Sequence, residues 1–380
     1  MVRKASSAFS KRSLVTVFVL LISLLIPLAH GVNGYVLNEI VSTRSGVAYC
    51  VHVIEDYAFV TGNDGVKVFD VSDPTSPSRV STLELADGAF DLCFDGWIAY
   101  IAADEEGLTI ADFTDPAHPE VLGTLNTGSS AYDVALEGHH AYVADNANGL
   151  RVVDVSDLGN PVMVGSHGFS DLRGVEVRGC VAYLAVPNSG LVVLNVSDPT
   201  APSGEWLVSG TYATINLHLG SEYLYISCHS RGTRILDVSN PLDPRIIGSY
   251  NIVGGEAYST YDDGDLLFVA DLQRGARLLD IGDPADPQEL ASFGTQPHDV
   301  FYDGEYAYLA CERGLVILQY GPPSTDQGSG TLNLVILLVA AGLIGVALYA
   351  YLRSREKNYE MKVRRLQRFL ALLLAAPISW

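Results

Sequence analysis

The sequence predicts an all-β protein: a seven-bladed β-propeller closed by an N-terminal strand, plus a C-terminal transmembrane helix. Two internal patterns and one uncharged stretch near the end of the chain support this. Seven glycines recur at spacings of 42, 42, 41, 42, 43 and 39 residues, at Gly65, Gly107, Gly149, Gly190, Gly232, Gly275 and Gly314. An aromatic residue lies six or seven positions before each glycine, at Phe59, Tyr100, Tyr142, Tyr183, Tyr225, Phe268 and Tyr308. A fixed period near 40 residues is typical of solenoids and propellers.

Each repeat contains four short runs with the composition of β-strands. Residues 131–168 include AYDVAL, HAYVAD, GLRVVDV and PVMVGS, separated by EG, NANG and SDLGN. These are strand and turn signals, and no window carries the 3.6-residue apolar stripe of a helix. Four strands in 42 residues predict one propeller blade. A parallel β-helix is the main alternative, but its coils are usually shorter and would not need these hairpin turns.

The two ends of the repeat array predict a closed ring. The last copy, beginning at His298, supplies three strands and then continues into GPPSTDQGSG. At the other end, YVLNEIVST at 35–43 resembles the fourth strand of a blade, PEVLGTLNT at 119–127. We therefore expect the N-terminal strand to complete the last blade, which leaves no open sheet edge in the ring.

A polar residue five positions after each glycine marks the end of a strand. It begins motifs such as DVSDP at 70–74, DVSD at 154–157 and DVSN at 237–240. Asp and Ser side chains accept backbone N–H bonds in turns, and Pro fixes φ there, so a structural turn is the favoured interpretation. A calcium site is the alternative, although the spacing matches neither an EF-hand nor a nonapeptide calcium motif.

The segments GVKVFDVSDP, GLRVVDVSD, GLVVLNVSDP and ARLLDIGDP resemble the LVIVD repeat, which is found in surface and secreted proteins of archaea and bacteria. The resemblance covers residues 35–320. It implies a propeller fold and an extracytoplasmic location. Because the family has no assigned activity, the resemblance implies no catalytic residue.

The first residues have the pattern of a secretory signal. Arg3, Lys4, Lys11 and Arg12 precede the apolar stretch from Leu14 to Ala29, and Gly31 follows. A basic region, an apolar region and small residues are typical of a signal peptide, which we assign to residues 1–31. An uncleaved anchor helix is the alternative, and it too would export the segment that follows.

Near the other end, residues 331–352 contain no charged residue, and 22 residues are about enough to cross a ~30 Å hydrocarbon core. Seven basic residues follow within 16 positions, at Arg353, Arg355, Lys357, Lys362, Arg364, Arg365 and Arg368. Positive charge is typical of the cytoplasmic side. We therefore predict a single-pass protein of the cell membrane, with the propeller outside, a linker at 321–330 and a basic cytoplasmic tail at 353–380.

The predicted propeller is strongly acidic. Between Tyr35 and Pro322 there are 41 acidic and 12 basic residues, a formal charge of −29, and Lys67 is the one lysine. This disfavours nucleic acid as a partner, since phosphate contacts need a basic surface. The charge favours solubility, and it would also attract cationic partners or divalent ions such as calcium. No other cofactor is indicated, and Asn195 begins a glycosylation sequon, Asn-Val-Ser.

Five cysteines occur, an odd number, without a CxxC pair or zinc spacing. Most are expected to be buried as small apolar residues. Cys50 begins the inner strand of the first blade, and Cys311 ends the second strand of the last. Because these blades become neighbours on closure, Cys50 and Cys311 are a candidate disulfide.

Aligning the repeats identifies candidate ligand-binding residues at the channel mouth, where inner strands begin. One ring position holds Cys50, Asp91, Asp133, Gly174, Asn216, Ser259 and Asp299. The preceding position is mostly aromatic, with Tyr49, Phe90, Tyr132, Arg173, Ile215, Tyr258 and His298. The second strands are expected to end near the same face. The candidates are Asp91, Asp133, Asp145, Arg173, Asn216, Asp271, His298 and Asp299.

The function predicted from these features is a membrane-anchored, monomeric surface module that binds a protein, a glycan or a cation. Catalysis is disfavoured, because the sequence contains no GxSxG, no HExxH and no Gly-rich phosphate loop. The alternative is an exported metal-assisted hydrolase or lactonase that uses the channel-mouth aspartates, with His298 as a further ligand. A structural envelope component without a discrete ligand is a third hypothesis.

Overall fold

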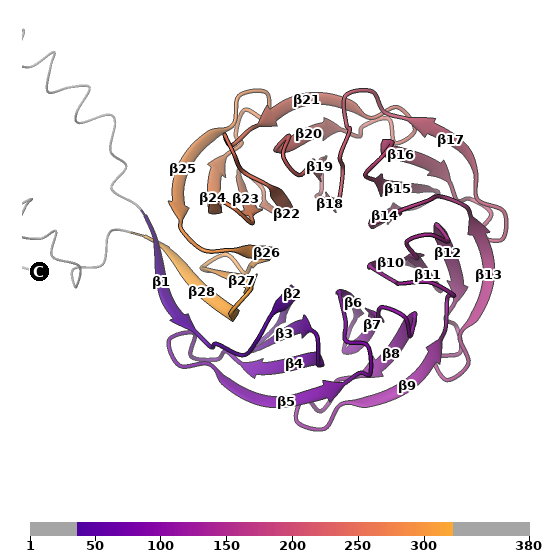
Figure 1. Ribbon diagram of the computed structural model, residues 1–380, viewed down its shortest axis with the longest axis horizontal. Coiled ribbons are helices and arrows are strands. Elements are labelled where there is room, and N and C mark those ends of the chain that lie inside the picture. Colours follow the sequence, from indigo (N-terminus) through magenta and orange to yellow (C-terminus); the bar gives the residue numbers. More distant parts are fainter. Residues whose placement is uncertain (1–35, 322–380) are drawn as a thin grey trace, which may run out of the picture. The chain divides into compact units, whose positions relative to one another are not determined.

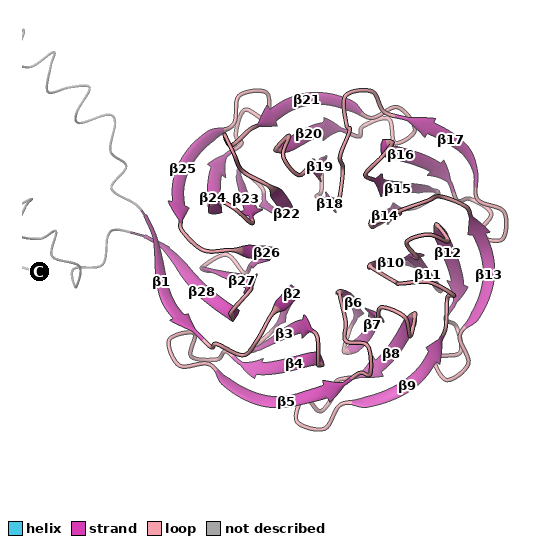
Figure 2. Ribbon diagram, in the orientation of Figure 1, coloured by secondary structure: helices cyan, strands magenta, loops and turns pink. Residues whose placement is uncertain are grey.

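The computed structural model describes residues 36–321, and within that range the chain forms strands and turns without a helix. The strands make seven four-stranded antiparallel sheets around a central channel (Figures 1 and 2). Six sheets take four consecutive strands, whereas the seventh has the order β1-β28-β27-β26. The predicted all-β, seven-bladed propeller is therefore confirmed.

The blades are numbered from β2, and each is given from its inner to its outer strand. Blade 1 contains β2 (Ala48–Ile54), β3 (Tyr57–Gly62), β4 (Gly65–Asp70) and β5 (Ser78–Glu84). Blade 2 contains β6 (Asp91–Asp95), β7 (Ile98–Ala102), β8 (Leu108–Asp112) and β9 (Glu120–Leu125). Blade 3 contains β10 (Asp133–Glu137), β11 (His140–Ala144), β12 (Leu150–Asp154) and β13 (Val162–His167). Blade 4 contains β14 (Gly174–Arg178), β15 (Val181–Val186), β16 (Gly190–Asn195) and β17 (Ser203–Leu207).

The remaining three blades follow the same pattern. Blade 5 contains β18 (Asn216–Leu219), β19 (Tyr223–Ser227), β20 (Thr233–Asp237) and β21 (Arg245–Tyr250). Blade 6 contains β22 (Ala257–Asp263), β23 (Leu266–Asp271), β24 (Gly275–Asp280) and β25 (Gln288–Phe293). Blade 7 contains β26 (Pro297–Tyr302), β27 (Tyr306–Cys311), β28 (Gly314–Gly321) and β1 (Val36–Ser42).

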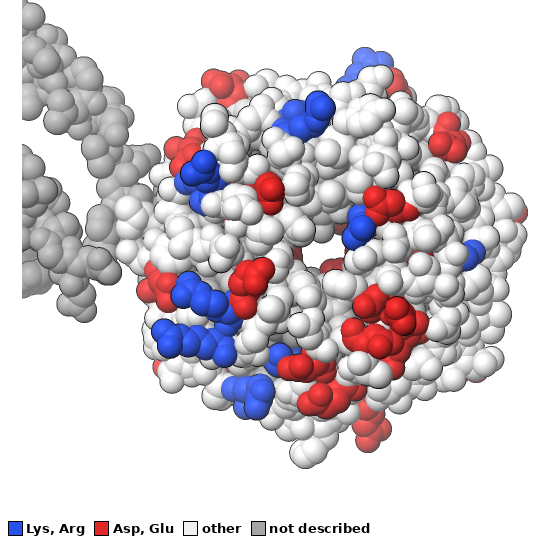
Figure 3. Space-filling model, in the orientation of Figure 1, with Lys and Arg blue, Asp and Glu red and all other residues white. Residues whose placement is uncertain are grey.

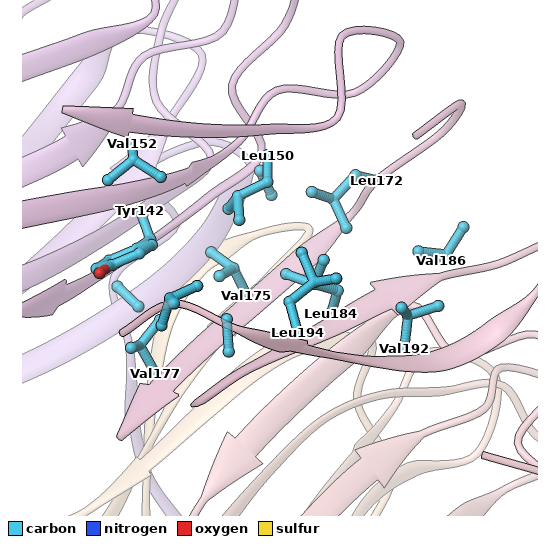
Figure 4. Close-up of a cluster of buried hydrophobic side chains, with 14 residues drawn as sticks. Tyr142, Leu150, Val152, Leu172, Val175, Val177, Leu184, Val186, Val192 and Leu194 are labelled. Carbon is cyan, nitrogen blue, oxygen red and sulfur yellow. The ribbon is translucent and has the colours of Figure 1, made fainter. Parts of the chain in front are cut away.

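The hydrophobic core is divided among the spaces between neighbouring blades. In one such cluster, Tyr142 and Val152 of blade 3 pack with Val175 and Leu184 of blade 4 (Figure 4). Each sheet is covered on both faces, which explains why its middle strands are apolar almost throughout. The repeated aromatic residues lie in these spaces with 0–4% of their surface exposed, at Phe59, Tyr100, Tyr142, Tyr183, Tyr225, Phe268 and Tyr308. The large area that each ring buries stabilises the contact between blades.

Blade 7 is closed by the N-terminal strand, as the sequence predicts. β1 pairs with β28 antiparallel, from Val36 opposite Gly321 to Ser42 opposite Val316. Leu37, 4% exposed, packs in the same apolar cluster as Leu318 of β28. The described chain therefore begins and ends at the same edge of blade 7 (Figure 1).

The repeated Asp or Asn at the end of the third strand in blades 1–6 organises a turn, which confirms the structural interpretation of this motif. In blade 1, Ser72 donates its backbone N–H and its hydroxyl to Asp70 Oδ1, at 2.9 and 2.6 Å. The backbone N–H two residues on is bound in the same way by Asp112, Asp154, Asn195, Asp237 and Asp280. Asn195, the sequon residue, is therefore half-buried in a turn, with its Oδ1 accepting a bond from Ser197 N.

Four predicted segments fall wholly or almost wholly outside the described residues. These are the signal peptide or anchor at 1–31, the linker at 321–330, the membrane span at 331–352 and the tail at 353–380. Over residues 36–321, we find no helix with the length and apolar character needed to span a membrane.

Candidate functional site

A pocket of about 460 Å³ lies at one mouth of the central channel, and every blade contributes to its lining. The opening is visible at the centre of the face in Figure 3, with acidic atoms at its edge. Each inner strand begins at this mouth, and residues at or next to its start line the channel. The pocket is thus a product of the repeat, since one sequence position supplies the same level of the wall in all seven blades.

Six of the eight candidate residues line this pocket, and they come from five blades. They are Asp91, Asp133, Arg173, Asn216, His298 and Asp299. The repeat alignment therefore brings together residues separated by more than 200 positions in the chain. Alignment of the ring position and of the position before it was enough to find them.

Asp145 and Asp271 do not line the pocket, so their placement at the mouth is corrected. Asp145 is completely buried in blade 3, where it accepts bonds from Thr127 Oγ1 at 2.6 Å and Arg151 Nε at 3.3 Å. Asp271 lies at the end of β23 and accepts backbone bonds from the following loop. Second strands lie one layer outside the inner strands, and their ends bind the adjoining hairpin rather than the channel.

An aromatic collar surrounds the mouth, formed by the position before the ring aspartates. The ring centroids of Tyr49 and Phe90 are 5.0 Å apart, and those of Phe90 and Tyr132 are 4.8 Å apart. On the other side of Tyr49, the His298 ring centroid lies at 5.6 Å. Arg173 lies over the ring of Tyr132, with its Cζ 4.2 Å from the centroid. Tyr258 and His229 extend the series beyond His298. The repeat alignment identifies the position that forms this collar. Of its members, the sequence predicts only Arg173 and His298, which are not Tyr or Phe, as ligand-binding residues.

The ring aspartates each bind the backbone of the next blade. Asp299 Oδ2 accepts Val51 N at 3.0 Å, and Asp133 Oδ2 accepts Val175 N at 2.8 Å. Asp91 Oδ2 makes a longer bond to Val134 N, at 3.4 Å. Inner strands present an unpaired edge, whose N–H groups need an acceptor. The carboxyl groups therefore join neighbouring blades while they remain on the channel wall.

Burial shifts these carboxyl groups towards their protonated form. It raises the pKa of Asp91 well above its usual range, and the nearby charge of Asp133 adds to the effect. The pKa values of Asp133 and Asp299 are also raised by burial. Asp91 and Asp133 hydrogen-bond to each other, which requires one proton between them. Of the two carboxyl groups, Asp91 has the pKa that is raised further, so it is the favoured holder of that proton.

Cys50 and Cys311 are both free, buried thiols, which corrects the predicted disulfide. Cys50 lies in the ring beside Asp91 and Asp299, and burial raises the pKa of its thiol. Cys311 instead accepts a bond from Thr295 Oγ1 at 3.5 Å. The two side chains belong to different layers of their blades, because Cys50 starts an inner strand and Cys311 ends a second strand.

A second layer of titratable groups lies two residues further along three of the inner strands, β14, β18 and β2. Glu176 accepts Leu219 N at 3.2 Å, and burial raises its pKa to about 7. His218 Nε2 lies 2.8 Å from Asp262 Oδ1. His52 lies between the rings of Phe94 and Phe301, and burial lowers its pKa to about 4. Among the described residues, no group of three or more His, Cys, Asp or Glu side chains has a metal-binding arrangement.

Glu176 predicts a specific pH dependence of stability. Its pKa is higher in the folded state, so its favourable contribution is complete below about 4.5 and is lost as the pH rises through about 7. We expect Glu176→Gln to reduce the fall in Tm between pH 5 and pH 8 by about 2 °C or more, relative to the parent chain. His52 titrates in both proteins, so its contribution cancels in the comparison. Differential scanning calorimetry measures this, and parallel Tm curves would contradict the assignment.

The repeat detected in the blades matches a known family. The LVIVD repeat pattern matches residues 45–84, 89–127, 128–167, 171–214, 213–252 and 254–295. The chain belongs to the LVIVD-repeat family. The six LVIVD matches span blades 1–6 and begin near the channel mouth, where each inner strand begins. Blade 7, whose fourth strand comes from the other end of the propeller, lies outside the six matches.

Solved propellers resemble the LVIVD chain in fold at low sequence identity. The β-propeller domain of Cps50 (Swd1) from Myceliophteria thermophila is 11% identical, with a TM-score of 0.62, and the match covers 74% of this chain and 99% of that one. The C-terminal WD40 domain of Sif2 is 12% identical, with a TM-score of 0.55, covering 76% and 99%. Sqt1 of Saccharomyces cerevisiae is 10% identical, with a TM-score of 0.56, covering 74% and 98%. No curated protein matches. These likenesses show the fold alone.

Proposed function

We propose that this protein is a cell-surface binding module that takes a small organic ammonium ligand at its channel mouth. The observation that carries the proposal is the combination of the aromatic collar with the aspartate ring in one pocket of about 460 Å³. Aromatic faces attract cations through the ring quadrupole. The aspartates one residue further along each strand place acidic oxygens beside the aromatic rings. A volume of several hundred Å³ is the usual size of small-molecule sites.

The charge distribution of the propeller supports a cationic ligand. Asp133 and Asp299 lie on the pocket wall, whereas Arg173 is paired with Asp171, with 2.6 Å between Nε and Oδ1. The surrounding excess of acidic residues increases the local concentration of cations. The signal-like N-terminus and the uncharged stretch at 331–352 support display outside the cell on a single membrane span.

The proposal predicts selective binding of choline, measured with the purified full-length chain by isothermal titration calorimetry. We expect choline to bind at least about tenfold more tightly than 3,3-dimethyl-1-butanol, its neutral isostere, because the cation–π and charge contributions amount to about 1.4 kcal/mol or more. Tyr49→Ala should abolish the preference. Glu105→Gln, an exposed carboxylate outside the pocket lining, should leave it unchanged.

Two results would contradict this function. Equal affinity for choline and its neutral isostere would exclude recognition of the ammonium charge. Binding of calcium to the same chain, abolished by Asp133→Asn but unaffected by Tyr49→Ala, would favour a metal site instead. Circular dichroism of each variant verifies that the fold is retained.

A further inference from the structure

The hairpins at the mouth end of the blades differ in charge, from acidic in blades 1 and 2 to basic in blades 5 to 7. The residue immediately before each repeat glycine is, from blade 1 to blade 7, Asp64, Glu106, Asn148, Ser189, Arg231, Arg274 and Arg313. This position lies between the second and third strands, at the mouth end of every blade. In Figure 3, the largest acidic cluster lies at the lower right of the face, and most of the basic atoms lie on the left and at the top, with acidic atoms among them.

Although the propeller is acidic, many of its arginines are concentrated in the mouth-end hairpins of blades 5 to 7. Residues 35–322 contain 12 basic residues, and five lie on these three hairpins: Arg231, Arg234, Arg274, Arg277 and Arg313. In blades 5 and 6 the arginines form the same motif, Arg-Gly-x-Arg. Its second arginine donates to the carbonyl oxygen of the first at 2.9 Å in both blades. The second arginine therefore fixes the loop that carries the first.

A groove of about 420 Å³ lies between the hairpins of blades 6 and 7, separate from the channel pocket. Arg274, Arg277 and Arg313 line it, together with the polar side chains of Thr295 and Gln296. Asp271 holds one wall, because its Oδ1 accepts the backbone N–H groups of Gln273 at 3.0 Å and Arg274 at 2.7 Å. A wall fixed in this way loses little entropy when a ligand binds.

The guanidinium groups of this groove are incompletely neutralised. Arg277 pairs with Glu289 at 3.3 Å, but its buried Nε has no hydrogen-bond partner within residues 36–321. The Nε of Arg274 donates a hydrogen bond to the carbonyl oxygen of Gly254, at 3.2 Å. Arg313, exposed at the hairpin tip, forms no ion pair with any residue that the structure describes. Glu312, the one carboxylate in the described lining, lies 3.7 Å from His298 Nε2.

We propose that this groove is a second binding site, specific for a tetrahedral oxyanion group such as sulfate or phosphate. The three arginines that line one groove suit such a group, because a guanidinium carries N–H donors in a planar fork that can bond two oxygens at once. Thr295 and Gln296 add neutral donors beside them. The oxyanion is either free or carried on a saccharide, and the two sources share this chemistry.

Titration calorimetry of the full-length chain at low ionic strength tests the site, with sodium sulfate and a sulfated disaccharide as probes. We expect saturable binding that weakens at least about tenfold in Arg313→Glu, since a guanidinium is replaced by a repelling carboxylate. Arg245→Glu is the matched control, because Arg245 begins β21 at the opposite end of its blade, beside the turn at Asp237. It should bind both probes like the parent chain.

The outcomes distinguish the two oxyanion sources, and they can also contradict the proposed site. Tighter binding of the disaccharide than of sulfate assigns the group to a saccharide, and equal affinities assign it to the free anion. The proposal is overturned if the parent chain binds neither probe, or if Arg313→Glu and Arg245→Glu weaken binding equally. Arg313→Lys, which keeps the charge but loses the fork, should give an intermediate affinity. Choline binding at the channel mouth is independent of all three variants, so either proposal can fail alone.

Discussion

A chain lacking residues 36–42 is expected to lose cooperative folding of the propeller. Removal of β1 leaves the edge of β28 unpaired from Val316 to Gly321 and exposes the apolar cluster that Leu37 covers. Total stabilities of folded domains are about 5–15 kcal/mol, so the loss of a paired and packed strand removes a large fraction of that figure. Urea unfolding followed by circular dichroism measures the effect, which should appear as a broad transition at low denaturant or none.

A permuted chain supplies the control for this deletion. Val36 lies opposite Gly321, so residues 36–45 placed after Gly321 through a two-residue Asn-Gly turn should fold back as the same outer strand. We expect most of the unfolding midpoint to be recovered in this variant. If the deletion alone unfolds at the parent midpoint, β1 does not close the ring in solution.

Tyr183→Ala should destabilise the propeller by about 3–5 kcal/mol, the usual cost of emptying a buried aromatic site. Tyr183 is 2% exposed and packs between blades 4 and 5 with Leu217 and Ile226. Neighbouring strands are held by backbone bonds and cannot collapse into the space, so a cavity remains. The shift in the urea midpoint, at constant m-value, measures the loss of unfolding free energy.

Tyr183→Phe is the matched variant for this position. It keeps the ring but loses the bond from the hydroxyl to the Pro241 carbonyl oxygen at 3.1 Å. Pro241 is exposed, so water can replace the lost donor, and we expect a cost of about 1 kcal/mol or less. Equal losses for Ala and Phe would show that the hydroxyl bond, rather than the buried ring, stabilises the contact.

The internal repeat made the fold predictable from the sequence. Gly65 and its six equivalents set the period, and the resemblance of residues 35–43 to a fourth strand located the closure that the β1–β28 pairing confirms. Strand patterns and turns in one repeat are weak signals, but seven copies constrain one another. The uncharged segment at 331–352 lies outside the described residues, so its assignment stays a prediction.

The site was predictable only where the repeat register fixed it. The ring position gave Asp91, Asp133 and Asp299, since an inner strand has one side towards the channel. Asp145 and Asp271 show the limit, because sequence places their strands at the correct end of the blade but not in the correct layer. The arginine groove depends on three loops that meet between blades. Loop contacts of this kind carry no periodic signal.

The adjacency of Val36 and Gly321 has a mechanical consequence. Tension applied to the two termini of the propeller would act at one end of an antiparallel pair and separate its residues one after another. Such peeling needs far less force than sliding two strands past each other, since few bonds resist at any moment. A pulling experiment on single molecules should therefore detach the outer strand of blade 7 first, at low force, before the remaining blades open.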